Sequence, residues 1–203
     1  MQKKYFITGI STEVGKTIVS AIFVEALQAD YWKPIQSGDL QYSDADKVKE
    51  LISNSKSEFH PNSYALETPM SPHASAEIDG VEICLKEILE PETNNHLVVE
   101  GAGGLLVPLN NQDTILDLIQ PEYKVVVVSR HYLGSINHKL LTVNLLKEKG
   151  FDIAIVFSGD QHPTTESIIS KMTEVPVLGS IDDEPYFDKN VVREYAHKFK
   201  AVL

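Results

Sequence analysis

The sequence predicts a single α/β domain, residues 1–203, with a mostly parallel β-sheet and helices on both of its faces. Two observations predict this fold class. Apolar runs of strand length recur along the chain, and several are continuous, such as the four valines Val125 to Val128; continuous runs suit strands that are buried on both faces. Helical patterns separate these runs, and strands that alternate with helices form parallel sheets.

The expected elements alternate from one end of the chain to the other. The strands are Tyr5–Thr8, Tyr31–Ile35, Leu97–Val99, Val125–Ser129, Ile153–Phe157 and Val177–Ile181. The helices are Lys16–Gln28, Ser43–Leu51, Glu82–Leu89, Asp113–Ile119, Ser135–Lys149, Thr164–Met172 and Lys189–Phe199. Ligands of such sheets bind at the carboxyl ends of the strands, so the residues that follow each strand are the candidates for a functional site.

Composition limits the classes of function. The 203 residues carry a net charge of -11, whereas non-specific nucleic-acid binding needs Lys and Arg to neutralise phosphates. Cys84 is the only cysteine, which excludes an intramolecular disulfide and fits a reducing cytoplasm. The N-terminus lacks the apolar core of a signal peptide, and no run approaches the ~20 apolar residues of a membrane span. We therefore expect a cytoplasmic protein with no nucleic-acid or membrane partner.

The stretch GISTEVGKT follows the first strand and predicts a phosphate-binding loop. Gly-Lys-Thr opens a helix, but five residues rather than the usual four separate Gly9 from Gly15. Amide N–H groups around Glu13–Ile18 can converge on phosphate oxygens at the helix start. Lys16 can reach the outer phosphates, and the hydroxyl of Thr17 can bind Mg²⁺. The alternative is a plain strand–turn–helix junction with an incidental lysine.

Polar residues also follow the second strand. Lys33 precedes Pro34 in the stretch KPIQSG, either as a functional lysine or as a solvated edge lysine before a turn. In the next stretch, SDADKVKE, Ser43 fits a helix N-cap with Asp46 as its capping-box partner. Asp44 or Asp46 can instead ligate a metal, and capping is the default role for one of the two.

The stretch HLVVEGAGGLLVPL gives the second strong signal. A buried apolar strand delivers Glu100 into the glycine-rich turn 101–104. Mg²⁺ beside phosphates takes carboxylate and hydroxyl oxygens, so Glu100 can supply one ligand opposite Thr17. A carboxylate at the end of a buried strand is costly unless it has a partner, which favours a site over a plain turn.

A second anion site is indicated after the valine-rich strand. Gly134 and Ser135 open a helix there, and the free N–H groups at a helix start attract a carboxylate or a phosphate. The alternative is an ordinary capped helix.

Taken in order, these stretches resemble the dethiobiotin synthetase family. The resemblance rests on GISTEVGKT with its longer loop, KPIQSG, SDA, TPMSPHASA, VEGAGGLLVPL and LGSINH, which run from Tyr5 to about Thr142, some two thirds of the chain. It implies a P-loop α/β fold, a homodimer and an ATP-dependent ligase of biotin biosynthesis. Such enzymes join CO2 to an amine of 7,8-diaminononanoate (7,8-diaminopelargonate). They then phosphorylate the carbamate with ATP and close the ureido ring as phosphate leaves.

The resemblance implies roles for the residues that match the family's motifs. Lys33 and Lys16 would be catalytic, and Thr17, Asp44 and Glu100 would hold Mg²⁺ beside the ATP. Further implied ATP contacts are Glu13, Val14, Gly15, Ile18, Gly101, Ala102, Gly103, Ser158, Ile181, Asp182 and Asp183. The implied substrate contacts are Thr12, Ser37, Gly134, Ser135, Ile136 and Asn137, the last four from the neighbouring subunit, with the active site at the interface.

One departure and two rival interpretations stand beside this resemblance. Ser158 stands where family members often carry an asparagine that reads the adenine edge, which leaves the nucleotide selectivity open. A P-loop switch ATPase of the partitioning and septum-positioning kind, a partner-binding module, would carry a lysine where this chain has Ser11. A cobyrinate-type amidoligase would need a glutaminase domain with a reactive cysteine, for which 203 residues leave no room.

Overall fold

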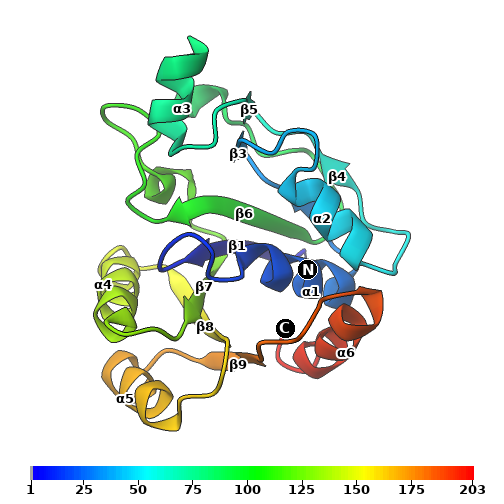
Figure 1. The fold of residues 1–203 in the computed structure, drawn as a ribbon, viewed down its shortest axis with the longest axis vertical. Coiled ribbons are helices and arrows are strands. Elements are labelled where there is room, and N and C mark those ends of the chain that lie inside the picture. The colour runs from blue at the N-terminus through cyan, green and yellow to red at the C-terminus, as the bar shows by residue number, and fades with distance from the viewer. Residues whose placement is uncertain (1) are drawn as a thin grey trace.

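The structure, a computed structural model, describes residues 2–203 and confirms the predicted class. Within these residues, seven strands form one sheet in the order β4-β2-β6-β1-β7-β8-β9 (Figure 1), and all neighbouring strands are parallel. The strands are β1 Lys4–Gly9, β2 Asp30–Trp32, β4 Phe59–His60, β6 Leu97–Gly104, β7 Lys124–Arg130, β8 Asp152–Ser158 and β9 Val177–Ile181. A separate parallel pair consists of β3 Ile35–Ser37 and β5 Tyr64–Leu66.

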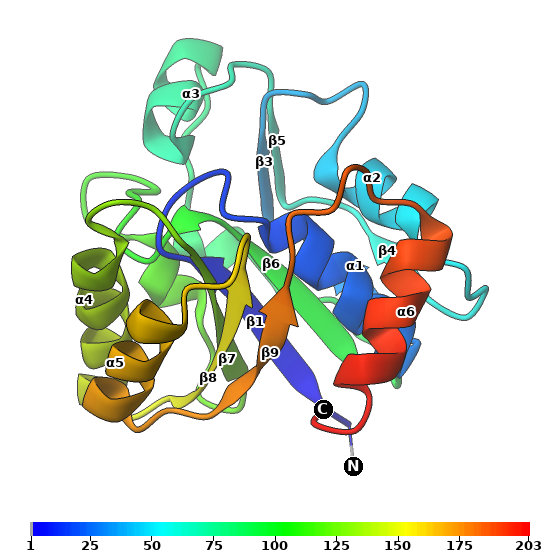
Figure 2. The same cartoon turned by 60° about the horizontal axis from the view of Figure 1, so that its bottom comes forward.

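Helices cover both faces of the large sheet (Figure 2). The described helices are α1 Lys16–Leu27, α2 Asp44–Leu51, α3 Pro72–Asp79, α4 Ser135–Glu148, α5 Pro163–Thr173 and α6 Lys189–Phe199, with short 3-10 turns η1 Leu85–Glu87 and η2 Ile115–Leu118. One face packs against α1, α2 and α6, and the other packs against α4 and α5. Among the described residues, no helix combines the length and the apolar character needed to cross a membrane.

The valine run of β7 shows why its sequence is continuous rather than alternating. Val125 and Val127 pack into the core under α4 and α5, and Val126 and Val128 pack into the core under α1 and α6. All four side chains are fully buried. Successive residues of a strand point to opposite faces, so a strand between two helical layers needs apolar residues at every position.

Two expected helices differ from the structure. The helix predicted at Glu82–Leu89 is wrong, because only the turn η1 forms there. Ile83 is buried whereas Leu89 is exposed, so the apolar residues of this segment do not share one helical face. The predicted helix Asp113–Ile119 is reduced to η2, which Thr114 and Asp117 cap reciprocally.

The strand predicted at Tyr31–Ile35 is broken at Lys33 and Pro34. Proline has no N–H to donate to a neighbouring strand, and the chain leaves β2 at this point to form β3 with β5. The helix α3 was not predicted. It begins with Pro72 in its first turn and ends at Gly80, which has a φ of 69°. Together, β3, β5 and α3 project beyond the carboxyl edge of the large sheet (Figure 2).

Candidate functional site

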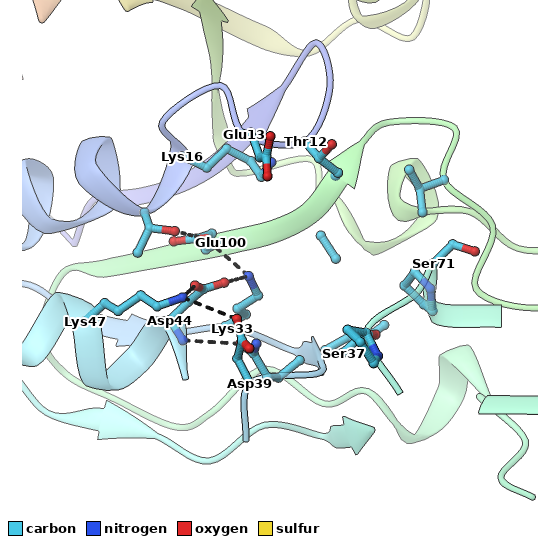
Figure 3. A pocket seen from close by; sticks show the side chains of 18 of the residues that line it. Thr12, Glu13, Lys16, Lys33, Ser37, Asp39, Asp44, Lys47, Ser71 and Glu100 are labelled. Carbon is cyan, nitrogen blue, oxygen red and sulfur yellow. Dashed lines mark hydrogen bonds and ion pairs between the residues drawn. The ribbon is translucent and has the colours of Figure 1, made fainter. Parts of the chain in front are cut away.

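A cavity of about 780 Å³ lies between the loop after β1 and the projecting β3 region (Figure 3). The carboxyl ends of β1, β2 and β6 therefore meet at one place, as the sequence predicts. Twelve of the predicted site residues line this cavity: Thr12, Glu13, Gly15, Lys16, Thr17, Ile18, Lys33, Ser37, Asp44, Glu100, Ala102 and Gly103.

The loop after β1 has the conformation of an anion cradle. A Cβ on Gly9 would lie 2.6 Å from the Cγ2 of Val14, so a larger residue would not allow this tight turn. Gly15 has a φ of 94° and begins α1 without a side-chain cap, which leaves the first N–H groups of the helix free for a ligand. Lys16 is 8% exposed, and its Nζ lies 3.1 Å from the carbonyl oxygen of Ser11. Burial lowers the pKa of Lys16, although the charge of Glu100 opposes this shift.

Opposite this loop lies a group of four side chains, Lys33, Asp44, Lys47 and Glu100, here called the carboxylate cluster (Figure 3). The Nζ of Lys33 donates to Oδ2 of Asp44 and lies 3.2 Å from Oε1 of Glu100. The Nζ of Lys47 lies 3.0 Å from Oδ1 of Asp44. Burial alone would lower the pKa of Lys33. The negative charges of Glu100 and Asp44 outweigh this effect, so the pKa of Lys33 is raised.

Glu100 is held by two further donors and is 1% exposed. The hydroxyl of Thr17 donates to Oε1 over 3.0 Å, and the hydroxyl of Tyr31 donates to Oε2 over 3.0 Å. Burial and the adjacent charge of Glu100 raise the pKa of Tyr31 well above its ordinary value. Tyr31 therefore stays a neutral donor that fixes the orientation of the carboxylate.

The donors gathered here suit Mg²⁺. Thr17 contributes a hydroxyl, and Asp44 and Glu100 contribute carboxylates that meet at the same ammonium group. Mg²⁺ bound with phosphates uses one or two carboxylates and keeps several waters. Across residues 2–203, no group of three or more His, Cys, Asp or Glu side chains is placed to hold a metal. The donor set thus fits an ion that shares its ligands with a nucleotide better than one held by protein groups alone.

The structure shows which of Asp44 and Asp46 caps the helix. Asp46 accepts from the backbone N–H of Ser43 over 2.9 Å, and Ser43 caps the N–H of Asp46 in return. This reciprocal capping box uses the carboxylate of Asp46 outside the cavity. Asp44, two residues earlier, lines the cavity instead.

Ser37 marks a second polar point on the cavity wall. Its Oγ is buried and has no hydrogen-bond partner among the described residues. Buried polar groups are nearly always hydrogen-bonded, so a polar ligand would supply the partner that the chain does not provide. The wall beside it is partly apolar, with Ile35, Met70 and Val107.

Ten predicted site residues do not line this cavity: Val14, Gly101, Gly134, Ser135, Ile136, Asn137, Ser158, Ile181, Asp182 and Asp183. Val14 belongs to the core, and a Cβ on Gly101 would lie 3.0 Å from the ring of Phe6. Ser158 lies directly behind the loop, because a Cβ on Gly15 would be 3.0 Å from its Oγ.

The loops after β7 and β9 meet at the rim of the cavity. Asp183 pairs with Arg130, with 2.9 Å between Oδ2 and Nη2, and Arg130 reaches the cavity wall. The predicted contacts of this loop with a base, at Ile181 to Asp183, stay a prediction.

The start of α4 is uncapped and is surrounded by exposed apolar side chains. Gly134 has a φ of 92°, and no side chain caps the helix. Leu133, Ile136 and Leu141 are all exposed on this helix or just before it. A groove of about 490 Å³ beside them is lined by Leu141 and shares Thr12 and Val107 with the cavity.

Sequence reasoning missed three residues of the site. Tyr31 was assigned to a strand only, although a tyrosine in a fully buried strand needs a partner for its hydroxyl. Gln36 lies in the stretch KPIQSG, and its Oε1 lies 3.4 Å from the backbone N of Asp44. Lys47 lies three residues after Asp44 on α2, and this spacing on a helix was the signal for an ion pair.

Comparisons with known proteins agree on one family. A family model described as an AAA domain matches residues 3–191. The ATP-dependent dethiobiotin synthetase BioD of Christiangramia forsetii is 63% identical over 204 residues, which cover 100% of this chain and 99% of the relative. The protein of the same name from Cytophaga hutchinsonii is 50% identical over 199 residues, which cover 97% and 96% of the two chains.

Several solved structures have a fold similar to that of this chain. The cell division ATPase MinD of Pyrococcus furiosus has a TM-score of 0.65 at 12% identity, with 100% of both chains covered. A ParA family ATPase from Chlorobium tepidum has a TM-score of 0.60 at 13% identity, with 100% of this chain and 90% of the other covered. Identities this low show the fold alone, and they confirm the predicted P-loop α/β type.

Proposed function

The chain belongs to the family of ATP-dependent dethiobiotin synthetases, and from this premise we propose how its cavity closes the ureido ring. The chain is an ATP-dependent ligase of biotin biosynthesis. The observation that carries the assignment of roles is the carboxylate cluster, which lies between a phosphate-binding loop on one side and the unpaired hydroxyl of Ser37 on the other.

The nucleotide binds with its phosphates against the loop after β1. The uncapped N–H groups that follow Gly15 and the ammonium of Lys16 face the phosphate oxygens. Thr17, Asp44 and Glu100 would hold Mg²⁺, and the ion would supply positive charge that neutralises the outer phosphates. The base is assigned to the side of Ser158, which lies behind the loop, and of Asp182 and Asp183 in the segment after β9.

The diamine binds on the Ser37 side of the cluster. One amine, in its neutral form, attacks CO2 and loses a proton to give the carbamate. Thr12 and Ser37 hold this group beside the γ-phosphate. Lys33 lies between the two anions, where its charge reduces their repulsion and stabilises the charge that develops during transfer.

The transfer and the ring closure follow from this arrangement. A carbamate oxygen attacks the γ-phosphorus, the bond to ADP breaks, and a mixed anhydride forms. The second amine then attacks the carbonyl carbon and loses a proton, and phosphate leaves with the electrons of its C–O bond. The protein's part is positioning and charge neutralisation rather than covalent chemistry.

A second subunit completes the site. The far carboxylate of the substrate binds at the uncapped start of α4, residues 134–137, supplied by the neighbouring copy in a homodimer. The exposed side chains of Leu133, Ile136 and Leu141 and the groove beside them support this assignment, because burying apolar surface is the main driving force of association. The groove joins the cavity at Thr12, so an adjacent copy would lie beside the diamine.

Mixed inactive variants test the shared site. Lys33→Ala removes the reacting side of the site, and Asn137→Ala removes the carboxylate side. Heterodimers of the two would contain one intact composite site, so mixing should restore part of the activity. No recovery after subunit exchange would place a complete site within each chain.

Product analysis by mass spectrometry tests the reaction itself. The protein is given 7,8-diaminononanoate, bicarbonate and Mg²⁺, with ATP, CTP or GTP offered separately. Dethiobiotin formed with an equal amount of ADP is the expected result. Product with CTP or GTP as well would assign relaxed base selectivity to Ser158, and Ser158→Asn should then narrow it. ATP hydrolysis without dethiobiotin would contradict the proposed reaction.

A further inference from the structure

We propose that Lys47 acts with Lys33 as a stand-in cation for the metal site, so that a divalent ion enters only together with the nucleotide. The inference rests on the proposed role of Asp44 and Glu100 as metal ligands. It assigns a role to Lys47, whose side chain lines the same cavity and has no role in the proposed reaction.

The geometry places an ammonium group on each oxygen that faces the cluster. Oδ2 of Asp44 accepts from Lys33, and Oδ1 lies 3.0 Å from the Nζ of Lys47. Oε1 of Glu100 lies 3.2 Å from the Nζ of Lys33. A metal that binds Oδ2 of Asp44 competes with Lys33 for that oxygen, and the charge of Lys47 on Oδ1 opposes a further cation on the same carboxylate.

The charge balance explains why the nucleotide is needed. Two carboxylates and two ammonium groups make the cluster neutral, and Lys16 adds a further cation nearby. A free divalent ion would add two positive charges to this group, at a cost set by Coulomb repulsion in a partly buried place. A nucleotide triphosphate carries enough negative charge to offset the metal and the released lysines together.

Of the two lysines that contact Asp44, Lys47 is the one that can move away from it. Its side chain is 33% exposed, and its Nζ also lies 3.7 Å from Oδ2 of Asp39, whose side chain is 73% exposed. Asp39 therefore offers an acceptor outside the cluster. The side chain of Lys33 is only 7% exposed, so on release it can turn only within the cavity, toward the reacting groups.

Titration with Mn²⁺ tests the inference without any assay of turnover. Free Mn²⁺ is followed by electron paramagnetic resonance, with full-length protein alone and with saturating ADP, and the Mn²⁺ that ADP itself binds is measured without protein and subtracted. Wild type should bind Mn²⁺ weakly alone and far more tightly with ADP. Without nucleotide, Lys47→Met should bind Mn²⁺ about fivefold more tightly than wild type, the size expected for loss of one partly exposed ion pair. With ADP present, this difference should shrink.

Two further variants make the comparison specific. Lys47→Arg keeps the charge and should bind Mn²⁺ as weakly as wild type. Lys49→Met removes an exposed lysine from the same helix and controls for the change in net charge. Equal affinities of wild type, Lys47→Met and Lys49→Met for Mn²⁺ would overturn the inference, and so would equal gains in the two methionine variants.

Failure of the metal assignment gives a different result. If Asp44→Asn left nucleotide-dependent Mn²⁺ binding unchanged, Asp44 would not be a ligand, and the inference would fall with that part of the proposed function. Dethiobiotin formation by the same wild-type preparation would separate this outcome from failure of the proposed reaction.

Discussion

Lys33 and Lys139 are both almost fully buried, yet their surroundings are opposite. Lys33 is 6% exposed and lies between two carboxylates, whereas Lys139 is 1% exposed and has an imidazole as its partner. The Nζ of Lys139 lies 2.9 Å from Nδ1 of His131 and 5.7 Å from the ring centre of Phe157. The nearest carboxylate, Glu166, lies on the far side of His131, 3.1 Å from its Nε2.

The difference teaches that the partner, rather than burial, decides whether a buried lysine keeps its charge. Burial opposes the charge of both lysines, but the carboxylates raise the pKa of Lys33. For Lys139, burial lowers the pKa to about 8, because the charge of Glu166 offsets it only in part. Burial and the charge of Lys139 also lower the pKa of His131, so a neutral ring can accept from Lys139 at Nδ1 and donate to Glu166 at Nε2.

The largest expected effect comes from removing the paired cation. Lys33→Met should lower the rate of dethiobiotin formation by about 10³-fold, because it removes a preorganised charge from the reacting groups. It also leaves Glu100 buried without its cation, which should cost about 3 kcal/mol of unfolding free energy. Mass spectrometry of the product and urea titration measure the two effects.

The same variant separates catalysis from nucleotide binding. ADP should bind to Lys33→Met nearly as tightly as to wild type in calorimetry, because Lys16 and the loop after β1 are unchanged. An equal loss of ADP affinity and of activity would place Lys33 in the nucleotide site. Lys49→Met, an exposed lysine on α2, is the matched control.

A smaller effect is expected when the carboxylate partner of Lys33, rather than Lys33 itself, is changed. Glu100→Gln keeps the size of the side chain but removes the charge that faces Lys33 and the proposed metal. The Mg²⁺ concentration needed for half-maximal rate should rise by at least about tenfold, the range seen when groups that tune a metal site are changed. Steady-state rates over a Mg²⁺ series measure this, and an unchanged Mg²⁺ requirement would remove Glu100 from the metal site.

The position of Lys33 in the site was predictable from sequence, and the surroundings of Lys139 were not. Lys33 lies in KPIQSG directly after a strand, where the topology of a parallel sheet already brings polar residues together. His131, Lys139 and Glu166 lie on β7's following loop, α4 and α5, and only the packing of these helices on the sheet brings them into contact. No spacing along the chain carries that information.

The elements of the fold also separate into those that the sequence predicts and those that depend on packing. Strands buried on both faces were found because their valines and isoleucines are continuous, whereas the segment 82–89 was misassigned because its apolar residues serve different surfaces. The helix α3 was not predicted because TPMSPHASA has too few apolar residues to show a helical periodicity. The position of α3 depends on the separate pair of strands β3 and β5, which no local sequence pattern predicts.

Lys139 links the stability of the fold to pH. The folded state gives up the proton of Lys139 near pH 8, and the unfolded state keeps it to about 10.5. Between these values the unfolded state binds more protons, so this group makes the unfolding free energy rise with pH. Relative to Lys139→Met, wild type should gain on the order of 2 kcal/mol across this window, with no difference in slope below it.

Urea titrations at a series of pH values measure this difference. Lys171→Met, which changes an exposed lysine on the adjacent helix α5, should follow the wild-type curve. Taking differences between variants cancels the tyrosines and other groups that titrate in the same range. Parallel curves for wild type and Lys139→Met would show that Lys139 keeps its charge in the folded state and that its surroundings resemble those of Lys33.

The smallest effect comes from a lysine that is paired but not buried. The Nζ of Lys198 lies 3.0 Å from Oε1 of Glu194 and 4.7 Å from the ring centre of Tyr195, and its side chain is 60% exposed. Lys198→Met should change the unfolding free energy by less than about 1 kcal/mol, because water competes for an exposed ion pair and salt screens it. A loss of unfolding free energy comparable to that of Lys33→Met would mean that an ion pair stabilises the charge of a lysine equally whether the pair is exposed or buried. The contrast between Lys33 and Lys139 would then reflect their partners alone, without the amplification that burial gives to a partner's charge.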